Sequence, residues 1–234
     1  MFLTKKCKWL SLFIFVVLKA TFLAQPGFAK DVASIEFLGF SDSGEAVFLQ
    51  KGRQDGSGFP YAILSSSIGT KTIELDAVVL ETSAATEEDA IAELSLQSVS
   101  QDLQPGSLLL LRVHTDLGSF EEDFEIHTSN HYQPDHQALK LTLSSLAIEA
   151  GASCYGLYSQ EVNFALSLSH GDTSEGQPTR IDLKPENCTQ SARIGAVFSH
   201  EPFVDTNRIA VFVMVEIPGF EGTKLRWIGI THEF

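Results

Sequence analysis

Alternation of apolar and polar residues with a period of two constrains the fold of this chain more than any other feature of its sequence. In residues 162–168, Val, Phe and Leu side chains alternate with Asn, Ala and Ser, and residues 139–143 repeat the pattern with Leu, Lys and Thr. Because successive side chains of a strand point to opposite faces, this pattern indicates strands with one buried face. Residues 194–198 form a further candidate strand. The chain is therefore expected to be rich in β-structure.

Residues 208–217 are apolar on both alternating sets of positions. One set would share a face of the strand, and it consists of Ile209, Val211, Val213, Val215 and Ile217. The residues between them include Ala210, Phe212 and Met214, which are apolar too. This pattern is typical of a central strand covered on both sides. The run PGFEG at residues 218–222 connects it to a strand predicted at 224–231, so the two are expected to form a hairpin.

One segment has the features of a helix. Thr86 is a good N-cap, and three carboxylates follow it in the first turn, where they favour the positive end of the helix dipole. Ile91, Leu94, Val99 and Leu103 could lie on one face of this helix. The Pro-Gly pair at residues 105–106 would end it.

The remaining segments complete the expected architecture. Residues 108–113 indicate a buried strand, whereas residues 115–137 and 170–190 are polar, rich in turn formers and predicted to be loops. No period of 20–50 residues repeats along the chain, which argues against a propeller or a solenoid. The expected fold is mainly β: a sandwich or a meander-rich antiparallel sheet assembly with one or two packed helices.

The first 29 residues have the pattern of a secretory signal peptide. Three lysines precede a short apolar run at residues 9–18, and Gly27 and Ala29 are small residues at the two positions that a signal peptidase reads. An α-helical membrane span needs about 20 apolar residues, and Lys19 interrupts this run too early. We therefore expect cleavage after Ala29, a single periplasmic or secreted β-rich domain over residues 30–234, and no stable membrane insertion after cleavage.

The net charge limits the classes of partner. The formal charge is −14, and loss of residues 1–29, which hold four lysines, would make it about −18. Such a field repels nucleic acid and anionic lipid, so neither is expected as a partner. The acidity serves solubility, and cation binding is the alternative.

Two cysteines would remain after cleavage, Cys154 and Cys188. In an oxidising compartment an isolated pair is most simply a disulfide. The alternative is two separate buried thiols. Neither cysteine lies in a recognisable signature with a histidine partner, so a nucleophilic role is not expected.

Three histidines are the candidate metal ligands: His127, His131 and His136, which lie close together in sequence with Asp135 among them. Imidazole groups could hold zinc or copper and leave one position open. The spacing differs from that of a zinc-protease helix, and Pro134 breaks any helix here. The alternative is a polar, solvated loop.

Other acidic residues give weaker indications of chemistry. Asp55 and the glycines near it resemble part of a calcium loop, but the EF-hand pattern is absent, and a turn capped by Asp55 is the alternative. The acidic run at residues 121–125 is expected to be solvated because no apolar flank would desolvate it. The sequence contains no nucleophile elbow, P-loop, H-E-x-x-H or dinucleotide fingerprint, so no catalytic residues and no cofactor are expected.

Both ends of the expected domain carry a family resemblance. The sequence reads FSDSG at residues 40–44 and QDGSGFPY at residues 54–61, and it reads PGFEG at residues 218–222, followed by Arg226. These runs resemble the signatures of a bacterial family of predicted secreted proteins of unknown function, and the two cysteines are a further point of likeness. The resemblance implies a periplasmic or secreted protein without an assigned activity. It supplies no catalytic residues.

Two functions of different class remain. The first is a non-enzymatic periplasmic or secreted domain that binds a protein, peptide or envelope component, with Asp55, Phe59, Tyr61 and Phe220 as candidate binding residues. The second is a metal-dependent hydrolase of unrecognised type that uses the three histidines. An enzyme needs the histidines to converge with a carboxylate in a cleft. A binding domain needs an exposed apolar or aromatic patch instead.

Overall fold

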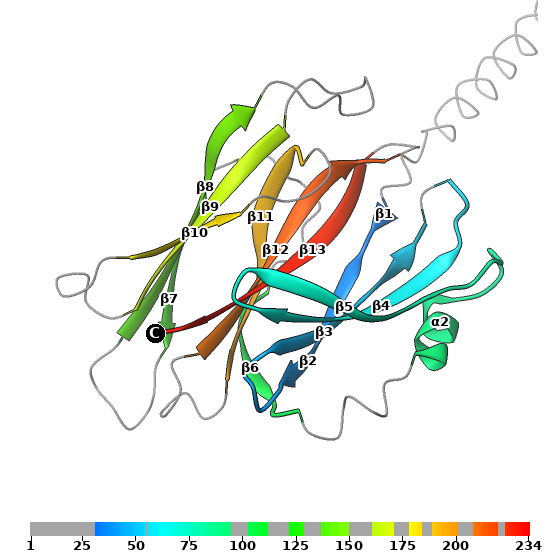
Figure 1. The fold of residues 1–234 in the computed structure, drawn as a ribbon, viewed down its shortest axis with the longest axis horizontal. Helices are drawn as coiled ribbons and strands as arrows, with labels where there is room; N and C mark the ends of the chain where they lie inside the picture. The colour runs from blue at the N-terminus through cyan, green and yellow to red at the C-terminus, as the bar shows by residue number, and fades with distance from the viewer. Residues whose placement is uncertain are drawn as a thin grey trace, which may run out of the picture.

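Three β-sheets and one short helix make up the fold in the computed structural model (Figure 1). The structure describes residues 31–54, 56–94, 103–111, 122–128, 137–149, 161–170, 178–183, 189–200, 208–219 and 223–234. The expectation of a mainly β protein built from antiparallel sheets with a packed helix is confirmed.

The N-terminal sheet is an antiparallel meander. Its order is β2-β3-β4-β5, and its strands are β2 (Ser34–Phe40), β3 (Ala46–Arg53), β4 (Pro60–Ile68) and β5 (Lys71–Val79). The first hairpin closes through a tight turn in which Gly44 N–H donates to the Ser41 carbonyl at 2.8 Å. Gly44 has φ +84°, a backbone conformation that glycine adopts readily.

The central sheet has the order β1-β13-β12-β11-β6. Its strands are β1 (Asp31–Val32), β13 (Thr223–Glu233), β12 (Arg208–Pro218), β11 (Ser191–His200) and β6 (Gly106–Leu111). β12 and β13 form the expected hairpin, paired over eleven positions. All neighbours in this sheet are antiparallel except β1, which runs parallel to β13.

The outer sheet has the order β10-β9-β8-β7 and is antiparallel. Its strands are β10 (Thr179–Leu183), β9 (Glu161–His170), β8 (Gln137–Glu149) and β7 (Glu122–Thr128). The helix α2 (Glu87–Glu93) follows β5 and lies beside the N-terminal sheet (Figure 1).

The central sheet is buried on both faces, as the doubly apolar pattern of β12 predicts. One face packs against the outer sheet, and its β12 residues are Ile209, Val211, Val213 and Val215. The other face packs against the N-terminal sheet, and its β12 residues are Ala210, Phe212 and Met214. A third cluster lies on the far side of the N-terminal sheet, where Ala90 and Leu94 of the helix segment cover β3 and β4. The layers are therefore outer sheet, central sheet, N-terminal sheet and helix.

A bulge in β11 keeps both faces of the central sheet apolar. Ile194 packs toward the outer sheet, whereas Ala196, two residues later, packs toward the N-terminal sheet. The register with β12 shifts between these two residues, at Gly195. A Cβ at Gly195 would overlap the six-membered ring of Trp227. Glycine here gives the Trp227 ring its space.

Four sequence predictions need correction. The segments predicted to be loops contain the strands β7 and β10, each at an edge of the outer sheet. The strand predicted to be buried at residues 108–113 is the edge strand β6, and Leu108 and Leu111 are about half exposed. The helix ends at Glu93, and Leu103 is not helical.

Candidate functional site

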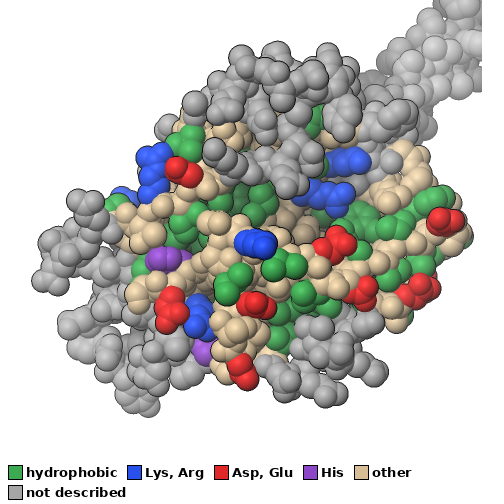
Figure 2. All heavy atoms as spheres, in the orientation of Figure 1, with side chains coloured by type: hydrophobic (Ala, Val, Ile, Leu, Met, Phe, Trp, Pro, Cys, Tyr) green, Lys and Arg blue, Asp and Glu red, His purple; other side chains and the backbone are tan. Residues whose placement is uncertain are grey.

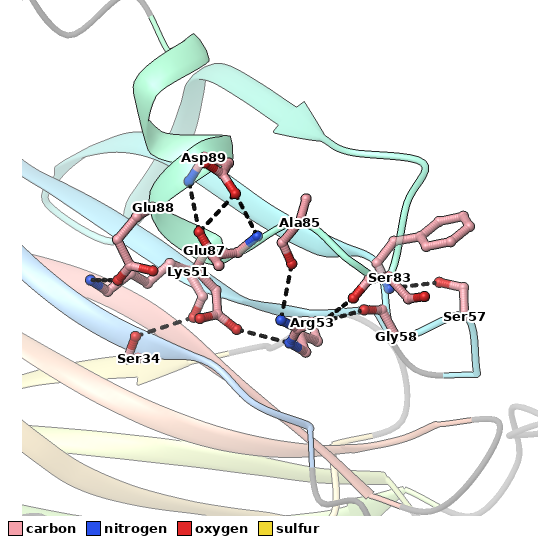
Figure 3. A network of polar contacts seen from close by, with 12 residues as sticks. Ser34, Lys51, Arg53, Ser57, Gly58, Ser83, Ala85, Glu87, Glu88 and Asp89 are labelled. Atoms are coloured by element: carbon pink, nitrogen blue, oxygen red, sulfur yellow. Dashed lines mark hydrogen bonds and ion pairs between the residues drawn. The ribbon is translucent and has the colours of Figure 1, made fainter.

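The turn at residues 54–61 is held in place by an arginine. Gly56 and Gly58 have φ values of +83° and +66°, so the turn uses the conformational freedom expected of its glycines. Arg53 lies at the end of β3, and its guanidinium donates to the Gly58 carbonyl at 3.0 Å. The same group donates to the carbonyls of Ser83 and Ala85, at 3.3 and 3.1 Å (Figure 3). Arg53 therefore ties the turn to the segment that leads into α2.

The start of α2 completes this network. Thr86 and Asp89 form a capping box, in which the Asp89 N–H donates to the Thr86 hydroxyl at 3.2 Å and the Thr86 N–H donates to the Asp89 carboxylate at 2.8 Å. The Thr86 N–H and the Thr86 hydroxyl both donate to the Asp89 carboxylate, and these two hydrogen bonds lower the pKa of Asp89. Arg53 also forms an ion pair with Glu87 at 3.2 Å, and Lys51 one with Glu88 at 3.8 Å (Figure 3). The expected N-cap is confirmed, and the two ion pairs join β3 to α2.

The candidate binding residues of the turn lie in different environments. Tyr61 is buried between the N-terminal and central sheets, and its hydroxyl accepts a hydrogen bond from Arg226 at 3.1 Å. Phe59 is partly exposed and belongs to none of the buried clusters. Asp55 and Phe220 lie outside the described residues. These contacts favour a structural role for the turn, and a binding role for these four residues stays a prediction.

A second cluster of polar side chains joins the turn after β2 to the central sheet. The Nε2 atom of His200 contacts the side-chain oxygen of Gln104, and the Gln104 amide donates to the Asp42 carboxylate at 3.1 Å. Burial lowers the pKa of His200, and the positive charge of Arg208 lowers it further. His200 is therefore held neutral near pH 7. The Phe40 N–H donates to the Gln104 carbonyl at 2.8 Å, and the Gln104 N–H donates to the Phe40 carbonyl at 2.7 Å. These contacts hold the end of β2 in place.

The outer edge of β13 is closed by groups of the N-terminal sheet. β1 pairs only with Lys224 and Leu225. Beyond it, the buried carboxamide of Gln50 accepts from the Trp227 N–H at 3.2 Å and donates to the Trp227 carbonyl at 3.4 Å.

Two further contacts continue the closure of this edge. The Thr72 hydroxyl donates to the Gly229 carbonyl at 3.3 Å, and the Thr231 N–H donates to the Gly69 carbonyl at 2.9 Å. Side chains and a turn thus replace a neighbouring strand along β13.

The outer edge of β5 differs from that of β13. No described strand pairs with it, because β5 is the last strand of the N-terminal sheet. Four large apolar side chains at or beside this edge are between 39% and 46% exposed: Ile68, Ile73, Leu75 and Val79. Figure 2 shows hydrophobic side chains interspersed with Asp and Glu over the region where β5 lies in Figure 1. This edge, from Lys71 to Val79, is the candidate binding surface and is called the β5 edge below.

The β5 edge was not among the candidate sites predicted from the sequence. The signal was present, because Ile73, Leu75 and Ala77 alternate with the acidic residues Glu74 and Asp76. Sequence periodicity does not reveal whether a strand has one neighbour or two, so the open side of β5 required the structure.

A family model described as predicted secreted protein, DUF2259, matches residues 47–232. The chain belongs to the DUF2259 family. The match runs from β3 to β13 and includes strands of all three sheets. It confirms the resemblance to a family of predicted secreted proteins of unknown function, and with it the expected location outside the cytoplasm. No curated protein and no solved structure matches the chain.

The DUF2259 match leaves the expected metal site and disulfide as predictions. His127 lies on β7, paired with Ala138, and its side chain lies outside the described part, as do His131 and His136. Within the described ranges, no group of three or more His, Cys, Asp or Glu side chains could hold a metal ion. Cys154 and Cys188 also lie outside the described residues.

The predicted signal segment, residues 1–29, is likewise not described. A search of the described residues finds no helix long and apolar enough to cross a membrane.

Proposed function

We propose that this member of the DUF2259 family is a non-enzymatic periplasmic or secreted domain that binds a protein, peptide or envelope component at the β5 edge. The observation that supports this proposal is the row of exposed apolar side chains on a strand whose outer edge has no described partner. An exposed apolar strand edge is an aggregation hazard unless a partner uses it.

Site-specific photo-crosslinking in the native cell tests this function. A photoreactive amino acid is placed singly at positions 73, 75 and 79 of β5, and at position 36 of β2 as the control. Glu36 is also exposed on an edge strand of the same sheet, so the comparison separates the β5 edge from strand exposure in general. We expect a discrete adduct from the β5 positions and none from position 36. Failure of all three β5 positions to give an adduct would contradict the proposal.

Two properties of the exported form are part of the proposal. We propose a mature chain of residues 30–234 and a disulfide between Cys154 and Cys188, because both cysteines would be in an oxidising compartment. Intact-mass analysis of exported protein, with and without reduction before alkylation, tests both. A mass that retains residues 1–29 would contradict the first, and two alkylated cysteines without reduction would contradict the second.

A further inference from the structure

We propose that the β5 edge binds its partner by β-strand addition, and that the partner is an extended segment with basic residues among apolar ones. This inference rests on the proposed binding function and adds the mode of binding and the chemistry of the partner. In strand addition the main chain of the partner pairs with the open edge of a sheet, while its side chains supply specificity.

The exposed apolar side chains lie on both faces of β5. Ile73 pairs with Ser66, which has the same parity in β4 as Ala62 and Leu64 of the helix-side cluster. Val79 pairs with Tyr61, which faces the central sheet.

A globular partner docked on one face would cover only one of these two side chains. An added strand lies in the plane of the sheet and presents alternating side chains to both faces. The distribution of exposed side chains therefore favours strand addition over docking on a face.

The other edges near β5 are protected in ways that β5 is not. The edge of β13 is closed by Gln50, Thr72 and Gly69. The end of β2 is bridged by Gln104, whose backbone pairs with that of Phe40. β5 has nine residues and no proline, although a bulge separates Glu74 from Asp76. Long unprotected edges are the ones to which extended segments add.

The charge of the β5 edge favours a basic partner over a second copy of this chain. Glu74 and Asp76 lie in the middle of β5, against a single basic residue, Lys71, at its start. Two copies paired antiparallel about Leu75 would bring Glu74 of one copy opposite Asp76 of the other. Like charges directly opposite each other destabilise a strand pair, whereas opposite charges stabilise it. Lysine or arginine side chains in the partner match this edge.

Binding of designed peptides to the full protein tests the inference. The probe is a peptide as long as β5 in which pairs of lysines alternate with pairs of valines, so that both residue types lie on both faces of the added strand; it has blocked ends and a fluorescent label. A second peptide carries glutamate in place of lysine. A third keeps the lysines and is N-methylated at every residue, which removes the donors of both edges of the peptide while its side chains remain. Fluorescence anisotropy measures the three dissociation constants.

We expect the lysine peptide to bind about tenfold or more tightly than either of the other two. Its affinity should also fall as salt is raised, because the charges are exposed. The double variant Glu74→Gln/Asp76→Asn should weaken binding by about three- to tenfold, as expected for two exposed charge pairs. The control Glu36→Gln removes an exposed charge from β2 and should leave the dissociation constant unchanged. Circular dichroism and thermal melting establish that both variants fold like the parent.

Several results would overturn the inference. Equal affinity for the N-methylated peptide would show that the main chain is not used. Equal affinity for the glutamate and lysine peptides would refute the preference for basic residues in the partner. Dimers that strengthen in Glu74→Gln/Asp76→Asn would identify a second copy as the occupant. Each of these leaves the proposed function standing if the β5 positions crosslink in cells, whereas absence of crosslinks refutes the function itself.

Discussion

Replacement of Gln50 by methionine tests how the two large sheets are joined. The Gln50 side chain satisfies both backbone groups of Trp227 at a buried position, on the side of β13 where, among the described strands, only the two-residue β1 pairs with it. Methionine has a similar length and no hydrogen-bonding amide, so Gln50→Met should leave the Trp227 N–H and carbonyl buried without these partners.

The expected loss follows from the number of orphaned groups. A buried donor or acceptor that loses its partner destabilises a protein by about 1–3 kcal/mol. Two such groups, offset in part by the apolar surface that methionine buries, give a loss of about 2–4 kcal/mol in the free energy of unfolding. For a chain of this size, each kcal/mol lowers the melting temperature by about 2–4 °C, so the shift should be about 4–16 °C.

Urea unfolding followed by tryptophan fluorescence measures the effect. The matched control is Gln54→Met, because Gln54 is exposed in the turn and its side chain only accepts a weak 3.3 Å hydrogen bond from Ser57. The control should lie within about 0.5 kcal/mol of the parent. If Gln50→Met is no less stable than Gln54→Met, then Gln50 is not needed to close the β13 edge, and the reasoning fails.

Three further predictions concern stability. Gly195→Ala should lower the free energy of unfolding by about 1–3 kcal/mol, because the new methyl group would overlap Trp227; equilibrium denaturation measures this. Thr86→Ala should lower it by about 1 kcal/mol through loss of the capping box, measured in the same way. The pKa values of His200 and His232 are lowered in the fold, mainly by burial, so near these pKa values the unfolded chain binds more protons than the folded chain. The melting temperature should therefore fall as the pH falls through about 6.5. The fall should be smaller in the double variant His200→Gln/His232→Gln.

Matched variants keep these predictions falsifiable. Gly58→Ala introduces a methyl group into open space, so its loss of stability reflects backbone strain alone. This loss should be smaller than the loss of stability caused by Gly195→Ala. Thr86→Ser retains a capping hydroxyl and should stay close to the parent. Equal losses for Gly58→Ala and Gly195→Ala, equal losses for serine and alanine at position 86, or an unchanged pH slope in the double histidine variant would each contradict the corresponding explanation.

Strong periodicity was enough to predict the interior strands. Residues 139–143 and 162–168 alternate because one face of β8 and of β9 is buried against the central sheet. Residues 208–217 are apolar throughout because β12 lies between two layers. In each of these strands, the positions of the apolar residues along the sequence match the faces that are buried.

Edge strands were predicted poorly for a physical reason. Among the described strands, β7 and β10 each have a neighbour on one side only, and their sequences, EDFEIHT and TRIDL, carry few apolar residues. A short polar strand of this kind resembles a loop in sequence. The opposite error occurred at β6, whose four consecutive leucines indicated burial although Leu108 and Leu111 are exposed at the sheet edge. Sequence periodicity reports the composition of a strand and leaves its number of neighbours undetermined.

The side-chain contacts that connect the layers could not be predicted from the sequence. Gln50, Arg53 and Gln104 stand in no motif, and each acts through partners far away in the chain or in another element. Gln50 and Arg53 bind backbone groups of other segments, and Gln104 binds side chains that the fold brings together. Sequence patterns carry no information about these partners.

The closure of the β13 edge also limits when the protein can fold. Gln50 is 177 residues from Trp227, Gly69 is 162 residues from Thr231, and Thr72 is 157 residues from Gly229. A chain that emerges from a translocation channel with its N-terminus first holds one partner of each contact exposed until β13 has passed through. Contacts of such long range form slowly. The strands of the N-terminal sheet can pair with one another before then, but their contacts with β13 cannot form, so the native fold is completed only when nearly the whole chain is across.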